Sequence, residues 1–128
     1  MTSGPFVMVK SSRPRVDWLL AACPFLRERP EIDFSNGDTC IFGDVSALVR
    51  SGKLSAAEAA SIFVFFNVLA EEGNDEDREV LATGALESFN DDAAGQEAAH
   101  RHLSGKALAL VEALRLSWGQ PDLRRRKT

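Results

Sequence analysis

The chain of 128 residues has only two cysteines and two histidines, and it lacks any long apolar run. Its densest apolar stretch, SIFVFFNVLA, covers ten residues and is followed by acids, so it is too short to cross a bilayer. The N-terminus lacks the order of charge, apolar run and small residues that marks a secretory signal. Cys23 and Cys40 stand far apart and outside any CxxC pattern, so we expect free thiols in a cytoplasmic protein.

Motifs that carry enzyme chemistry are also missing. The chain contains no G-x-S-x-G, no P-loop, no G-x-G-x-x-G and no H-E-x-x-H. His100 and His102 are two positions apart, so a regular helix would point them about 200° apart, away from a shared metal ion. No other histidine or cysteine lies near enough in the sequence to complete a zinc site. We therefore expect no catalytic residue, no metal site and no cofactor.

Charge is present in quantity, and it is unevenly distributed. Residues 1–70 hold seven basic and seven acidic side chains, residues 71–97 hold one basic and ten acidic, and residues 98–128 hold seven basic and two acidic. The last segment ends in the run RRRK before the final threonine. Binding to nucleic acid needs basic side chains gathered on one face, so this acidic body argues against nucleic acid as the main ligand.

The apolar spacing predicts an all-α fold: about five helices in a compact bundle with HEAT-like antiparallel helix hairpins. No segment with the alternating pattern of a β-strand competes with this interpretation. We divide the chain into a flexible N-terminal arm (1–14), one helical domain (15–119) and a basic C-terminal tail (120–128). The helices are expected at residues 15–23, about 44–51, 55–72, 75–90 and 105–118.

The helix at 55–72 has the clearest signals. Ser55 and Glu58 form the S-x-x-E pattern of a capping box. Apolar side chains then recur at helical spacing, which places this helix at the centre of the bundle. The expected core positions are Ile62, Phe65, Phe66 and Leu69, broadened by Phe63. Gly73 is expected to end the helix in the left-handed conformation.

The helix at 75–90 should begin at the N-cap Asn74 and return antiparallel to the previous one, because only GND joins them. Its buried face is expected to hold Leu81, Ala82, Ala85, Leu86 and Phe89, and Gly84 should admit a neighbouring helix at close range. A loop is expected over residues 90–96, and a helical turn or two over 97–103. Ser104 should cap the last helix, whose stripe comprises Ala107, Leu110, Val111, Leu114 and Trp118.

The acids near the middle of the chain divide by their local roles. Asp75, Glu76 and Asp77 fall in the first turn of a helix, where negative charge complements the helix dipole. Glu71 and Glu72 fall at a helix C-terminus, where acids are mildly unfavourable. Placement against local helix physics suggests a use in binding.

Three segments carry a resemblance: FGDVSALV, IFVFFNVLAEEGNDEDREVLATGALESF and LVEALRLSWGQP. Over about residues 15–118 the chain resembles small all-helical bacterial immunity proteins encoded beside polymorphic or contact-dependent toxins. The resemblance implies that the protein binds and blocks a cognate toxin, and it transfers no particular site residue.

We therefore expect a non-enzymatic protein that occludes a basic toxin surface with an acidic patch, with no membrane partner and without nucleic acid as its main ligand. A regulatory or scaffold helical domain is the alternative, and a small metal-dependent hydrolase using His100 and His102 is a weaker one. The predicted partner-binding residues are Glu71, Glu72, Asp75, Glu76, Asp77, Glu87, Asp91, Asp92 and Trp118.

Overall fold

The computed structural model describes residues 14–117 and 119, and every regular element in this part of the chain is helical. The all-α class is thus confirmed, with six α-helices there instead of about five; the HEAT-like hairpins are not confirmed. Residues 1–13 of the N-terminal arm, the basic tail and Trp118 lie outside the described residues, so predictions about them remain predictions; Pro14, the last residue of the predicted arm, already begins the first helix. The α-helices are α2 (Pro14–Ala22), α3 (Asp38–Ser51), α4 (Ala56–Glu72), α5 (Asp75–Val80), α6 (Ala93–His102) and α7 (Gly105–Ser117).

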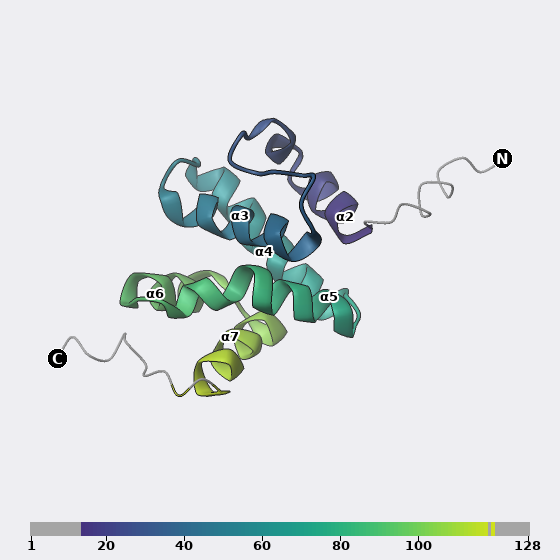
Figure 1. The fold of residues 1–128 in the computed structure, drawn as a ribbon. Coiled ribbons are helices and arrows are strands. Elements are labelled where there is room, and N and C mark those ends of the chain that lie inside the picture. Colours follow the sequence, from purple (N-terminus) through teal and green to yellow (C-terminus); the bar gives the residue numbers. More distant parts are fainter. Residues whose placement is uncertain (1–13, 118, 120–128) are drawn as a thin grey trace.

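Three shorter segments complete the fold. A 3₁₀ segment, η2 (Pro24–Glu28), follows α2. After α5 the chain continues without a break through the π-helical segment η3 (Leu81–Leu86) and the 3₁₀ segment η4 (Glu87–Asn90). In Figure 1 this run from α5 to η4 crosses the middle of the molecule, with α2 and α3 on one side and α7 on the other.

Helix α4 is the central element, because α2, α5, η3, α6 and α7 all pack against it. Its start is the capping box expected at Ser55: the Ser55 hydroxyl accepts from the Glu58 amide, and the Glu58 carboxylate accepts from the Ser55 amide. The predicted stripe is confirmed as core, and burying each of these side chains stabilises the fold by about 1.5–3 kcal/mol. The buried residues of the stripe are Ile62, Phe63, Phe65, Phe66 and Leu69.

The end of α4 differs from its prediction. Gly73 is extended, with φ −78° and ψ 171°, and not left-handed. Space is the reason for glycine here: a Cβ atom would lie 2.6 Å from the Leu69 carbonyl oxygen and 2.7 Å from the Asp77 Cβ. The tight passage brings Asn74 into place as the N-cap of α5, as predicted, with its side chain accepting from the Asp77 amide.

The run from α5 to η4 packs most extensively against α3, not against α4. A Cβ on Gly84 would lie 2.8 Å from the Thr39 carbonyl oxygen, so the predicted close approach at Gly84 is confirmed and its neighbour is α3. Helix α3 itself starts at Asp38, about one and a half turns earlier than expected, with Gly37 as its N-cap. The predicted inner face of the run is buried throughout: Leu81, Ala82, Ala85, Leu86 and Phe89.

Residues 93–102 form a full helix, α6, where the sequence predicted a loop followed by a turn or two. The N-cap is Asp92, whose side chain accepts from the Gly95 amide. Gly95 lies directly against the backbone of Phe89, where a Cβ would approach the Phe89 carbonyl oxygen to 2.7 Å. Gly95 therefore serves close packing between this helix and the preceding segment.

Candidate protein-binding surface

The predicted acidic residues fall into two groups at opposite ends of one helical run. Asp75 and Asn90 are the first and last residues of that run, which makes it about 24 Å long at a rise of 1.5 Å per residue. The fold therefore does not gather these acids into one patch. We call Glu71, Glu72, Asp75, Glu76 and Asp77 the acidic corner, and Glu87, Asp91 and Asp92 the distal acids.

Arg15 holds part of the acidic corner in place. Its guanidinium contacts Asp77 Oδ1 at 2.9 Å and Glu76 Oε2 at 3.2 Å, and it reaches Asp38 Oδ2 on α3 at 2.6 Å. Burial opposes the charged form, but hydrogen bonds to Asp77, Asp38 and Glu76 raise the pKa of Arg15 above its ordinary value. The Asp77 carboxylate also accepts from the Asn74 amide, so Asp77 has a structural role.

Arg78 binds residues on the other side of the acidic corner. It donates to the Gly73 carbonyl oxygen at 2.6 Å and to the Ala70 carbonyl oxygen at 3.3 Å, which satisfies acceptors at the end of α4. The same guanidinium pairs with Asp75 Oδ1 at 2.8 Å, although the Asp75 side chain is fully exposed. This exposed pair leaves the Asp75 carboxylate accessible to solvent.

The expectation that Glu71 has no local role is wrong. Its Oε2 atom accepts from the Lys106 amide at 2.9 Å and so caps the start of α7, a helix for which the sequence predicted Ser104 as cap. The side chain of the next residue, Glu72, is exposed and makes no hydrogen bond or ion pair with any residue in 14–117. Glu72 is therefore the most available carboxylate of the acidic corner.

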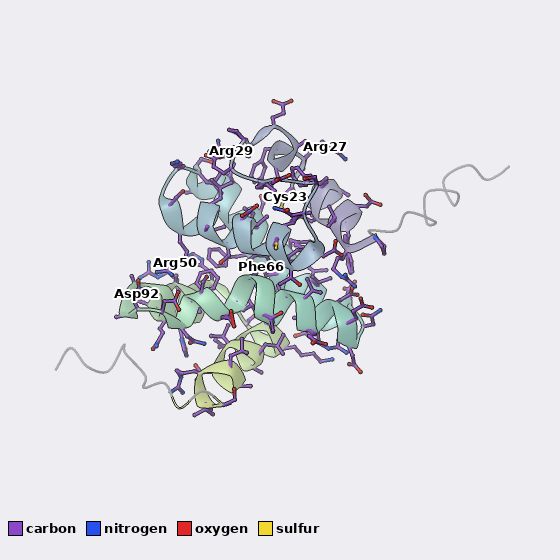
Figure 2. The ribbon with its side chains drawn as sticks, in the orientation of Figure 1. Cys23, Arg27, Arg29, Arg50, Phe66 and Asp92 are labelled. Atoms are coloured by element: carbon purple, nitrogen blue, oxygen red, sulfur yellow. The ribbon has the colours of Figure 1, made fainter. Side chains whose placement is uncertain are left out.

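The distal acids have a different character. Asp92 pairs with Arg50 of α3 at 2.6 Å, and both side chains are labelled in Figure 2 at the α3 face of the run. Bonds to the Gly95 amide and to Arg50 lower the pKa of Asp92. Arg50 also donates to the Ser88 carbonyl oxygen at 2.8 Å. The Asp92 carboxylate is thus engaged in structural contacts, whereas its neighbour Asp91 is exposed.

Both histidines make side-chain contacts with other residues of the fold. His100 on α6 places Nε2 at 2.7 Å from Glu112 Oε2, which ties α6 to α7, and Nδ1 at 3.1 Å from the Gln96 carbonyl oxygen within α6 itself. His102 stacks on Phe63 with ring centroids 4.6 Å apart. Among the described residues no group of three or more histidine, cysteine or acidic side chains is arranged to hold a metal ion.

The cysteines are free thiols, as predicted. Cys23 is fully buried among apolar side chains, and burial raises the pKa of its thiol to about 11. A thiol in this state is a poor nucleophile, because the thiolate is the reactive form. Cys40 is exposed on α3.

One surface feature was missed at the sequence level: an apolar groove of about 470 Å³ between α2 and α4. The exposed Val64, with 59% of its surface accessible, lies in it. The available signal was that α4 is apolar on nearly all sides, whereas a surface helix normally has a polar face. The residues lining the groove are Trp18, Ala22, Ala57, Ala60, Ser61, Val64, Phe65 and Val68.

Comparison with known proteins gives no relative for this chain: no protein-family model, no curated protein and no solved structure matches it. Within the part of the chain that the structure describes, no helix combines the length and the apolar character needed to cross a membrane.

Proposed function

We propose that the protein is a non-enzymatic binding protein of the immunity type, which neutralises a basic toxin domain by covering its surface. The observation that carries this proposal is the uncompensated charge of the acidic corner. Three of its five carboxylates pair with an arginine: Glu76 and Asp77 with Arg15, which is shared with Asp38, and Asp75 with Arg78. Glu72 has no counter-ion in the described part of the chain.

An excess of negative charge at one corner acts mainly on the rate of association. It attracts a basic partner over about 10 Å at 0.1 M salt, the distance beyond which ions screen exposed charges. Such steering raises the association rate and disfavours acidic competitors, while it adds less to the lifetime of the complex. A toxin whose active cleft is basic would meet this corner first and would then be blocked sterically.

The test begins with the full chain as bait in extracts of its own host, followed by association kinetics with the purified partner at two ionic strengths. Glu72→Lys should slow association about threefold at low salt, because the change reverses one exposed charge in the acidic corner. The difference in association rate between this variant and the parent should become smaller at high salt. Asp91→Lys reports in the same way on the distal acids.

The matched control is Glu97→Lys, a reversal of an exposed acid on α6 outside both groups. Its association rate should equal that of the parent chain to within the smaller effect of total charge. If Glu72→Lys and Glu97→Lys behave alike at low salt, the acidic corner is not the recognition surface, and the proposal is wrong in that respect. If the captured partner is acidic, it is wrong entirely.

A further inference from the structure

The apolar groove between α2 and α4 is built for contact with apolar side chains. Trp18 lies edge-on to Phe65 with ring centroids 5.9 Å apart and forms one wall. Ser61 is one of two lining residues with a polar side-chain group, and its hydroxyl already donates to the Ala57 carbonyl oxygen at 3.0 Å. Small-molecule sites normally hold a few free polar groups that orient the ligand. This lining therefore favours the apolar surface of a larger partner over a small molecule.

The groove continues into the acidic corner along one row of α4. Ala60, Val64 and Val68 line the groove and follow one another at four-residue spacing. The next position in this row is Glu72, one turn beyond Val68 and without a partner among residues 14–117. Residues spaced by four form a ridge on a helix surface, and such ridges pack into the grooves of another helix. An apolar row that ends in a carboxylate therefore presents a composite, directional surface.

We propose that this groove seats an amphipathic helix of the protein partner, with its apolar row against α4 and a lysine or arginine over Glu72. The inference rests on the proposed function and names the form of the partner. No strand occurs among the described residues, so the surface offers no sheet edge to an extended peptide. The alanines at 57 and 60 leave room for a helix to approach closely.

The dimensions set the length of the partner segment. The lining on α4 runs from Ala57 to Val68, which is about 17 Å along the helix axis and three turns. A bound helix would match this with apolar anchors at i, i+4, i+7 and i+11 and a basic residue one turn further on. The apolar row would supply the lasting contact, and the ion pair at Glu72 would fix the register and the direction of the helix.

The probe is a fluorescein-labelled synthetic helix of about 18 residues with leucines at i, i+4, i+7 and i+11 and arginines beyond the last leucine. A second peptide has the same composition in scrambled order, and a third replaces the arginines by glutamates. Binding to the full chain is followed by fluorescence anisotropy. Emission of Trp18, recorded in a Trp118→Phe background, reports whether the groove is filled.

The patterned basic peptide should bind at least about tenfold more tightly than the scrambled one, and it should shift the Trp18 emission to shorter wavelength. Val64→Glu should weaken this binding at least about tenfold, because it places a charge in the apolar row. Leu116→Glu is the matched control: Leu116 is also an exposed large apolar residue, at 66%, and lies outside the groove. Its affinity should equal that of the parent. Glu72→Lys should weaken binding of the basic peptide about threefold and should not weaken binding of the glutamate peptide.

Several results would overturn the inference. Equal affinity of Val64→Glu and the parent, or of the patterned and scrambled peptides, would show that the groove does not select an amphipathic helix. Binding that arises only after residues 1–13 are deleted would assign the groove to the chain's own N-terminal segment. A concentration-dependent dimer that Val64→Glu abolishes would assign it to a second copy.

The two proposals fail separately. A captured partner whose association is slowed by Glu72→Lys but unaffected by Val64→Glu would keep the proposed function and remove the helix from the groove. A partner lost with Val64→Glu but indifferent to the charge reversal would keep the groove and remove the electrostatic mechanism.

Discussion

Phe66 and Val64 lie two positions apart on α4 and have opposite surroundings. Phe66 is fully buried among the aromatic side chains of the core, whereas 59% of the Val64 surface is exposed. An apolar side chain in the core stabilises the fold by the area that it hides from water and by close packing. The same chemistry at Val64 leaves apolar area available for a partner. Position on the helix, not residue type, decides between stability and binding.

Phe66→Ala should lower the free energy of unfolding by about 3–5 kcal/mol, because it removes buried apolar surface and leaves a cavity that its neighbours fill only in part. Val64→Ala, the control on the exposed face, should change the free energy by less than about 1 kcal/mol. Urea denaturation of both variants measures the difference. Similar losses for the two would mean that Phe66 does not lie in the packed core.

Asp92→Asn should reveal an ion pair that depends on pH. Asparagine retains an oxygen to accept from the Gly95 amide, but it loses the charge that pairs with Arg50. The pKa of Asp92 is lowered in the folded state, so the ion pair contributes stability above the ordinary aspartate pKa and loses it as the pH falls through the folded value. The side chain is 56% exposed, and solvent limits the effect at neutral pH to below about 1 kcal/mol.

Denaturation of the parent and the variant should therefore differ at pH 7 and converge as the pH falls through the lowered pKa of Asp92 in the folded state. Asp91→Asn is the neighbouring control, an exposed acid outside this ion pair. A difference between Asp92→Asn and the parent that grows toward acid would contradict the assigned sign.

At the scale of elements, α4 organises the turn between α6 and α7. Its Asn67 side chain donates to the His102 carbonyl oxygen at 3.1 Å and accepts from the Ser104 amide at 3.0 Å. One turn later, Glu71 caps α7 through the Lys106 amide. Two polar side chains of α4 thus fix where α6 ends and where α7 begins, although they are distant in sequence from that turn.

Glu71→Ala should lower the free energy of unfolding by about 1 kcal/mol, because an amide in the first turn of α7 loses its acceptor. Amide hydrogen exchange should accelerate more in the first turn of α7 than in α3. Glu72→Ala, a change of the adjacent acid, should leave both quantities as in the parent. Equal exchange in the two variants would mean that Glu71 does not cap α7.

The crossing of α3 and η3 gives a graded pair of glycine variants. In Gly84→Ala the new methyl group would meet the Thr39 carbonyl oxygen at 2.8 Å, so α3 must move, whereas in Gly43→Ala it would meet the Gly84 carbonyl oxygen at 3.3 Å. Overpacking costs about 1–3 kcal/mol and alanine's helix propensity returns about 1 kcal/mol. Thermal melts should therefore show a clear loss for Gly84→Ala and little change for Gly43→Ala. The reverse order would be inconsistent with this crossing.

Local signals explain what the sequence could predict. The caps at Ser55 and Asn74 involve residues three positions apart, and the core stripe of α4 follows helical spacing, so both were predictable. The π-helical geometry of η3 was not predicted; it coincides with the contact between Gly84 and α3, which is not local in sequence. Likewise, nothing near Glu71 in the sequence indicates that α7 starts beside it.

The candidate site shows the same difference between local signals, which the sequence reveals, and contacts that are distant in sequence. The acidic residues were visible as a compositional excess, but only the fold shows that they form two groups and that Asp77 and Asp92 are engaged in structural contacts. The apolar groove required knowledge of which face of α4 is left open by α2. The hydrophobic pattern marked α4 as central and could not distinguish a covered face from an open one.

At the scale of the whole molecule, one side chain joins three elements. Arg15 on α2 contacts Asp38 at the start of α3 and both Glu76 and Asp77 at the start of α5. Only 10% of the Arg15 side chain is exposed, and Asp38 and Asp77 are also largely covered. A shielded cation among several carboxylates balances mutual repulsion that would otherwise separate these helix ends.

Arg15→Met should lower the free energy of unfolding by about 1–3 kcal/mol, because it retains the apolar stem and leaves the carboxylates unpaired. Added salt should reduce the loss by screening their repulsion. Arg29→Met, which removes only the short-range pair with Glu31, should be nearly neutral. Chemical denaturation at two ionic strengths measures both, and a loss independent of salt would point to packing instead of charge.

The close crossing of α3 and η3 makes the two halves of the chain mutually dependent. Ser46 on α3 donates to the Ala85 carbonyl oxygen at 2.8 Å, and Arg50 reaches the Ser88 carbonyl oxygen, so this interface joins segments on either side of α4 in sequence. The connection between α3 and α4 is short and exposed at Gly52 and Lys53. A chain nicked there would consist of two fragments that each lack half of a core, and association of the fragments would rebuild the interface. A cut at this connection would divide the sequence into two parts, whereas the packing of α3 against η3 would still hold these parts together.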